Sequence, residues 1–231
     1  MCLFFFFSLK EMKNLVRTLT TKSPRELVKF YYDFKSPYSY LALQPTLELE
    51  KQYAIELKFL PWPFRAEETF GGNLQERNRL NWNKVRYLYL DCRRFANERG
   101  LIIRGPERLF NSRLALIAGL YADRHGYFRP FADRVFQLFF NRKLNLEDEN
   151  EIVKLLYETS DRKQSFEDLL KDFQNYLNNQ GAIEYSDADK QAESDKIFGV
   201  PAYVIRDELF WGHDRLAWVK KRLVSLNLAR K

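Results

Sequence analysis

The sequence predicts an α/β fold in which strands near the two ends of the chain enclose a long helical block. Strand patterns occur at residues 27–34 and 54–60, with a helical pattern between them. Further strand patterns occur at residues 201–206 and 209–211, ahead of a final helix. The stretch between, residues 64–197, has almost entirely helical spacing. A chain of 231 residues is long enough for one domain with a large insertion.

The first strand leads directly into a helix with a marked start. Residues 27–34 are rich in aromatic and branched side chains, which suit a buried strand. Ser36 is a natural N-cap, and Pro37 fits the first helical position, where its missing N–H costs nothing. We therefore expect the Ser36 hydroxyl to lie among free backbone N–H groups at the positive end of a helix, where an anion can bind. The helical spacing continues through residues 38–51, with a kink expected at Pro45.

The second strand and the helical block follow. Residues 54–60 alternate between apolar and polar, and Pro61 and Pro63 end the strand. We expect residues 64–81 to form a loop. Helical periods then predict helices at residues 82–99, 112–124, 131–141, 148–159, 165–179 and 187–197.

The C-terminal strands complete a recognisable order. Residues 201–206 and 209–211 read as a hairpin, and a final amphipathic helix follows. The order of elements is therefore strand–helix–strand, then a helical block, then strand–strand–helix. This is the layout of a thioredoxin fold that carries an inserted helical domain. We assign residues 27–63 and 198–231 to a discontinuous thioredoxin-like domain and residues 64–197 to the insertion. Residues 1–26 are expected to form a poorly ordered tail.

Composition narrows the possible partners. The net charge of +7 fits nucleic acid, a membrane surface or small anions. The arginines are spread through helical segments, and no zinc-finger or RNA-recognition signature occurs, so we expect no nucleic-acid partner. The sequence contains no apolar run of about 18 residues, so we expect no membrane-spanning helix. The two cysteines, Cys2 and Cys92, form no CxxC pair, which predicts a reducing cytoplasmic location, no disulfide framework and no metal site. Cys92 lies on an apolar helix face and is expected in the core.

Three segments could carry chemistry. A thioredoxin-type site lies at the start of the first helix, where Ser36 and Ser39 occupy both positions of a dithiol; disulfide exchange needs a thiolate, so it is excluded there. The alternative is that Ser36 only caps the helix and has no role in chemistry. Pro201 is expected to be cis and to face this helix start, or else simply begins a strand. Asp214 either favours a helix dipole or grips an amino group, and His213 is either a polar surface residue or a general base.

These segments resemble a known family. The segments 33–42 (DFKSPYSYLA), 198–201 (FGVP) and 209–216 (LFWGHDRL) are similar to 2-hydroxychromene-2-carboxylate isomerases, which belong with kappa-class glutathione transferases in the DsbA-like branch of the thioredoxin superfamily. Gly72-Asn73 and the segment 84–87 with Asp91 add to the match. The resemblance extends from about residue 27 to residue 226.

The resemblance implies a glutathione site. Ser36 would hydrogen-bond the glutathione sulfur and favour its thiolate, and Val200, before the cis Pro201, would pair with the cysteinyl backbone. His213 and Asp214 would hold the γ-glutamyl end. The two remaining contacts, to glutathione or to the carboxylate of the substrate, would come from Asn73 and Lys84. The match departs at His213, where the kappa pattern has serine, and in residues 60–81, which should line the acceptor pocket.

The implied reaction is an isomerisation of a conjugated acid from aromatic catabolism. The thiolate would add to a conjugated carbon and leave again, so glutathione would act as a cofactor. A homodimer acting on a small anionic substrate is expected from the resemblance. The alternatives are a kappa-like glutathione transferase or peroxidase, and a non-catalytic DsbA-like binding protein.

Overall fold

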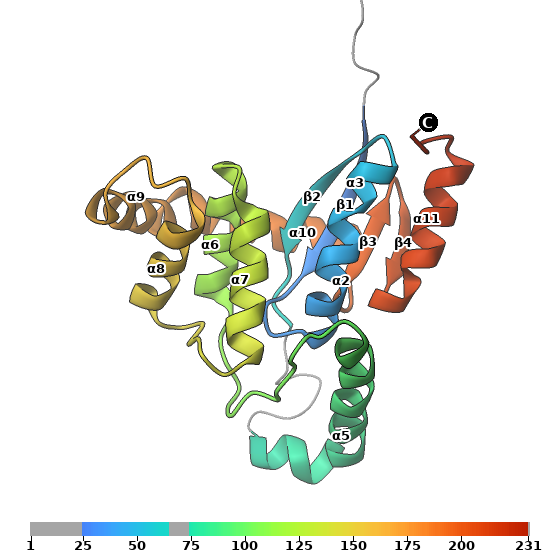
Figure 1. Cartoon of the computed structure of the whole chain (residues 1–231), viewed down its shortest axis with the longest axis horizontal. Coiled ribbons are helices and arrows are strands. Elements are labelled where there is room, and N and C mark those ends of the chain that lie inside the picture. The colour runs from blue at the N-terminus through green and yellow to red at the C-terminus, as the bar shows by residue number, and fades with distance from the viewer. Residues whose placement is uncertain (1–24, 65–73, 231) are drawn as a thin grey trace, which may run out of the picture.

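The computed structural model describes residues 25–64 and 74–230. Its strands are β1 (Glu26–Tyr32), β2 (Ile55–Pro61), β3 (Ala202–Ile205) and β4 (Glu208–Trp211). They form a four-stranded sheet in the order β2-β1-β3-β4 (Figure 1). β1 pairs parallel with β2 and antiparallel with β3, and β3 pairs antiparallel with β4. The predicted parallel beginning and antiparallel end of a thioredoxin-like sheet are therefore confirmed.

The helices fall into three groups along the chain. Between β1 and β2 lie α2 (Pro37–Leu47) and α3 (Leu49–Gln52). The block between β2 and β3 contains α5 (Leu74–Glu98), α6 (Arg113–Arg124), α7 (Phe128–Phe140), α8 (Glu149–Thr159), α9 (Phe166–Asn178) and α10 (Gln180–Ser194). After β4 come the 3₁₀ turn η1 (His213–Arg215) and α11 (Leu216–Ser225). In Figure 1, α2 and α11 lie near the sheet, α6 to α9 form a separate group beside it, and α5 extends below α2.

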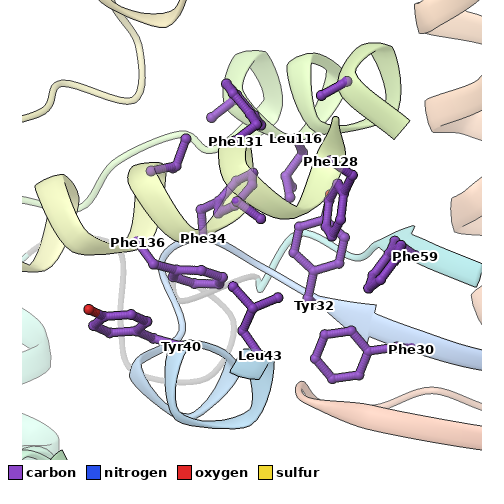
Figure 2. Close-up of a cluster of buried hydrophobic side chains, with 14 of the residues drawn as sticks. Phe30, Tyr32, Phe34, Tyr40, Leu43, Phe59, Leu116, Phe128, Phe131 and Phe136 are labelled. Carbon is purple, nitrogen blue, oxygen red and sulfur yellow. The ribbon is translucent and has the colours of Figure 1, made fainter. Parts of the chain in front are cut away.

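Alternation along the strands gives the sheet two apolar faces. On β1, Phe30 and Tyr32 belong to a large core shared with α2, α6 and α7, whereas Tyr31 belongs to a smaller core shared with α10. Figure 2 shows the larger cluster, in which rings from β1 and β2 meet rings from α7. Phe59 of β2, for example, stacks on Phe128 of α7 with 4.1 Å between the ring centroids. Because successive strand side chains point to opposite faces, one strand serves both cores.

Some predicted helix bounds are wrong. Residues 74–80, expected to be loop, are helical, and α5 carries a non-helical residue at Asn81. These residues include few apolar ones, so they show no helical hydrophobic period. Most of them are nevertheless good helix formers, and their intrinsic helix propensity supports the helix. α7 begins at Phe128, since Pro130 is tolerated in a first helical turn, whose N–H groups have no intrahelical acceptor. α10 begins seven residues earlier than predicted, at Gln180, with Gly181 inside its first turn.

Pro45 lies inside α2, and the helical run is divided at Glu48. A proline has no N–H, so the carbonyl four residues earlier, that of Leu41, has no helical donor. The Arg99 guanidinium donates to the Leu41 carbonyl oxygen at 2.5 Å. This bond replaces the missing helical one and ties the end of α5 to α2.

The element order agrees with the predicted layout, while the domain bounds themselves stay a prediction. Residues 1–24 of the predicted tail and the segment 65–73 lie outside the described residues. Within residues 25–64 and 74–230, no helix is both long and apolar enough to cross a membrane.

Candidate active site

A cavity of about 450 Å³ lies at the N-terminus of α2. Its walls come from the start of α2, from α5, from residues 106–110 and from the segment that precedes β3. The described lining residues include Lys35, Ser36, Lys84, Arg108, Val200 and Trp211. Most other lining side chains are apolar, so the cavity combines an apolar body with a few polar groups, as small-molecule sites do.

Ser36 is the N-cap of α2, as predicted, and Pro37 follows in the first turn. The Ser36 Oγ atom accepts a hydrogen bond from the Ser39 N–H at 3.1 Å and donates one to the Val200 carbonyl oxygen at 3.3 Å. The hydroxyl therefore joins the positive end of a helix to the segment before β3. Ser39 is fully buried, and its hydroxyl has no hydrogen-bond partner among the described residues.

The segment before β3 forms the opposite wall. The Val200–Pro201 peptide bond is cis. Gly199 lies under the Trp211 indole so closely that an added Cβ would approach the indole nitrogen to 2.5 Å. The Trp211 and Phe198 rings pack together with 4.9 Å between their centroids, and both are more than half exposed. Two aromatic rings thus form an exposed edge of the cavity.

A buried carboxylate supports the turn that carries Ser36. Asp33 has no exposed surface, and its two oxygens accept the backbone N–H groups of Lys35 at 3.0 Å and Phe64 at 2.7 Å. The Lys35 ammonium lies 3.7 Å from Asp33 and donates to the Phe64 carbonyl at 3.0 Å. Burial raises the pKa of Asp33, and the Lys35 charge and the two N–H groups oppose this rise.

His213 packs behind the cavity wall. Its ring stacks on Tyr38 with 4.8 Å between centroids and meets Phe95 edge-on at 4.6 Å. The Tyr38 hydroxyl donates to Asp91 of α5 at 2.8 Å. Burial lowers the pKa of His213, against the raising effect of Asp214 and Asp91. Tyr38 lines the cavity, so His213 contacts the cavity wall from behind through that ring.

A family model described as "DSBA-like thioredoxin domain" matches residues 27–224, which is most of the chain. The chain belongs to the DSBA-like thioredoxin domain family.

Within this DSBA-like family, the similar curated proteins are named 2-hydroxychromene-2-carboxylate isomerase. The chain is 29% identical to one from Pseudomonas putida over 87% of its own length and 95% of the relative. It is 26% identical to one from Sphingobium xenophagum, over 86% of this chain and 98% of the relative. A solved 2-hydroxychromene-2-carboxylate isomerase aligns with a TM-score of 0.68 at 27% identity, over 87% of this chain and 95% of that one. The resemblance stated from the sequence motifs is confirmed.

Solved structures with a DsbA-type description are less similar in sequence. A probable DsbA oxidoreductase from Streptomyces coelicolor aligns with a TM-score of 0.61 at 15% identity, over 87% of this chain and 89% of that one. At that identity the likeness shows the shared DSBA-like fold alone.

The structure brings together three of the predicted site residues along the cavity wall. Ser36, Lys84 and Val200 line it, and Pro201 follows Val200 directly. Asp214 is half exposed and pairs with Arg215 at 2.5 Å. His213 and Asp214 are not among the described lining residues, and Asn73 lies outside the described residues.

Sequence reasoning missed three charged residues of this DSBA-like site. Asp33 carried a signal, because a charged residue at the end of a buried strand needs a partner. Lys35 carried one too, since it stands next to the N-cap. Arg108 had no sequence signal, because it follows an irregular connector. In the structure its guanidinium lies 4.0 Å from the centre of the Phe110 ring and pairs with Glu147 at 2.7 Å.

Proposed function

We propose that this DSBA-like protein is a glutathione-dependent isomerase whose substrate is a conjugated acid of the 2-hydroxychromene-2-carboxylate type. The relatives of that name support an isomerase activity. The observation that carries the proposal is the hydrogen bond between Ser36 and Val200 at the cavity wall. It brings the helix N-terminus and the cis-proline segment together at one point.

The residues present fit glutathione. The cavity volume of about 450 Å³ lies within the range of small-molecule sites. Glutathione carries two carboxylates, and the cavity wall contains the cations Lys35, Lys84 and Arg108. The apolar remainder of the lining suits the aromatic part of the proposed substrate. The charge, volume and apolar lining of the cavity thus agree with a tripeptide anion and an aromatic acid.

Ligand binding would exchange the Ser36–Val200 hydrogen bond for two others. The Ser36 hydroxyl would turn from the Val200 carbonyl to the ligand sulfur, while it still accepts the Ser39 N–H. The Val200 carbonyl would then be free to accept the cysteinyl N–H. A hydrogen bond at 3.3 Å is long for an O–H donor, so this exchange costs little.

The chemistry follows from these positions. Bound glutathione would supply a thiolate that adds reversibly to a conjugated carbon of the substrate. Ser36 and the α2 N-terminus would favour the negative charge on sulfur by a hydrogen bond and by the helix dipole. Lys84 or Arg108 would orient the substrate carboxylate, with Arg108 exchanging Glu147 for it. Asp214 would hold the γ-glutamyl ammonium after releasing Arg215, and His213 would support that end through Tyr38.

An isomerisation assay tests the proposal. We expect conversion of 2-hydroxychromene-2-carboxylate to require added glutathione and to leave its concentration unchanged. Ser36→Ala should reduce kcat by about 100-fold, the scale of losing one stabilising donor. Ser39→Ala is the matched control, because it removes from the same helix turn a buried hydroxyl that has no hydrogen-bond partner among the described residues.

Other outcomes point to the alternatives. Consumption of glutathione in proportion to product would indicate a transferase. Absence of glutathione binding at millimolar concentration would indicate a non-catalytic DsbA-like binding protein and would overturn the proposal. The cytoplasmic location and the homodimer stay predictions, the latter to be tested by sedimentation of the purified protein.

A further inference from the structure

The proposed reaction steps assign no chemical role to the charged residues directly beside Ser36. Asp33 is fully buried, and each of its oxygens accepts a backbone N–H, one from Lys35 and one from Phe64. These donors belong to two segments, the turn after β1 and the end of β2. Asp33 therefore holds together the two chain segments that carry this part of the cavity wall.

The Lys35 ammonium is held by the same arrangement. It donates to the Phe64 carbonyl at 3.0 Å and lies 3.7 Å from the Asp33 carboxylate. Its side chain is only 18% exposed, although lysine is a long and mobile residue. Lys35 lines the cavity beside Ser36, and Asp33 does not. A ligand in the cavity would therefore contact Lys35 directly and would not contact Asp33.

The charge of this ammonium also acts on Glu147, which pairs with a second lining residue. The pKa of Glu147 is lowered mainly by the hydrogen bond from Arg108, and the Lys35 charge contributes to the lowering. Arg108, the partner of Glu147, lines the same cavity. In a site of low polarity, a fixed charge stabilises an opposite one more strongly than in water.

We propose that Lys35 is the fixed positive charge that stabilises a thiolate next to Ser36, and that Asp33 and the Phe64 carbonyl position its ammonium for this. The inference rests on the proposed function, because the anion it stabilises is the sulfur of bound glutathione. It adds a second source of stabilisation to the Ser36 hydroxyl and the helix N-terminus. An ammonium already anchored in place needs little reorganisation when the negative charge forms.

The alternative is that Asp33 and Lys35 are only a structural ion pair. The chain contains a similar pair on the preceding strand: Lys29 of β1 pairs with Asp195 at 2.6 Å and is also 18% exposed. Both pairs lie at the sheet, but the described lining of the cavity includes neither Lys29 nor Asp195. Removing the lysine from either pair leaves a carboxylate without its cation, so both changes should affect stability in similar ways.

The test measures the thiol pKa of glutathione bound to the full chain, by ultraviolet absorbance of the thiolate. We expect Lys35→Met to raise this pKa by about one pH unit, the lower end of the effect of an opposite charge nearby. Lys35→Arg should restore the wild-type value, and Lys29→Met should leave it unchanged whatever it does to thermal stability. Glutathione saturates each variant, so weaker binding does not disturb the reading.

The outcomes separate this inference from the proposed function. An unchanged thiol pKa in Lys35→Met, with wild type lowering it, would overturn the role of Lys35 and leave glutathione dependence intact. An equal rise in Lys29→Met would show a structural effect and would also overturn it. If the wild-type protein binds no glutathione, the proposed function fails and this inference fails with it.

Discussion

Ser36 has two tasks at once, because the hydroxyl that caps α2 also reaches the carbonyl of Val200. The first task was predictable from sequence, since serine followed by proline marks a helix start. The second was not, because it depends on a segment 164 residues away. The same limit applies to His213, whose stacking on Tyr38 is a tertiary contact. A helix cap can be predicted from neighbouring residues in the sequence, whereas contacts between distant segments can be identified only from the folded structure.

His213 gives the fold a pH dependence. Burial lowers its pKa below the ordinary value of 6.5, so the folded protein binds this proton less readily than the unfolded chain does. The stability that this residue contributes is complete above about pH 6.5 and is lost as the pH falls toward the folded-state pKa. His213→Phe keeps a ring and removes the titration. We expect the free energy of unfolding of wild type, from urea titrations, to fall more steeply than that of the variant between about pH 7 and pH 5.

Equal pH slopes for the two proteins would contradict the account of His213. A steeper fall in the variant would contradict it too, because that would mean that protonation of His213 stabilises the folded state.

Cys92 is expected to be unreactive in the folded protein. It is fully buried in α5, as the sequence predicted, and burial raises the pKa of its thiol to about 11. At pH 8 only about one molecule in a thousand would then carry the reactive thiolate. We expect iodoacetamide to leave the Cys92 peptide unlabelled, as read by mass spectrometry.

The matched control for this labelling is the same protein in guanidinium chloride, where the Cys92 peptide should react fully. Rapid labelling of that peptide without denaturant would show that this part of α5 opens readily.

At the scale of elements, strands were predicted better than helix starts. β2 and the β3–β4 hairpin follow from alternation and turn residues, which are local signals, and the parallel pairing of β1 with β2 follows from the strand–helix–strand order. The start of α10 was missed because Asn179 and Gly181 look like a break. The structure gives Gly181 a different reason: α10 passes close to α9 and α6 at this residue.

Gly181→Ala should therefore destabilise the protein. A Cβ there would lie 2.7 Å from a Tyr176 ring carbon and 2.8 Å from an Ile117 methyl. The gain in helix propensity, up to about 1 kcal/mol, is smaller than the cost of overpacking, about 1–3 kcal/mol. We expect a net loss of up to about 2 kcal/mol in the free energy of unfolding by urea titration.

Gly105→Ala serves as the control for this prediction. Its added Cβ would lie 3.6 Å from the Tyr89 ring, an ordinary contact, so we expect little change. A stabilised Gly181→Ala variant would show that α10 can move away from α9 without cost.

At the scale of the whole molecule, the site lies where the sheet end meets the helical block. α2 and the segment before β3 come from the thioredoxin-like part, while α5 and residues 106–110 come from the long stretch between β2 and β3 (Figure 1). The sequence motifs predicted Ser36 and Val200 of the first wall but not Lys35. The second wall was predicted in outline only, because residues such as Arg108 reach the cavity through packing that no local pattern encodes.

The central claim is that this cavity binds glutathione and activates its thiol at Ser36. The most direct test is the thiol pKa of glutathione bound to wild type and to Ser36→Ala, measured by thiolate absorbance against pH. We predict a value below that of free glutathione for wild type, and a return toward the free value in Ser36→Ala, while Ser39→Ala resembles wild type. A bound thiol with the same pKa in wild type and Ser36→Ala would contradict the claim.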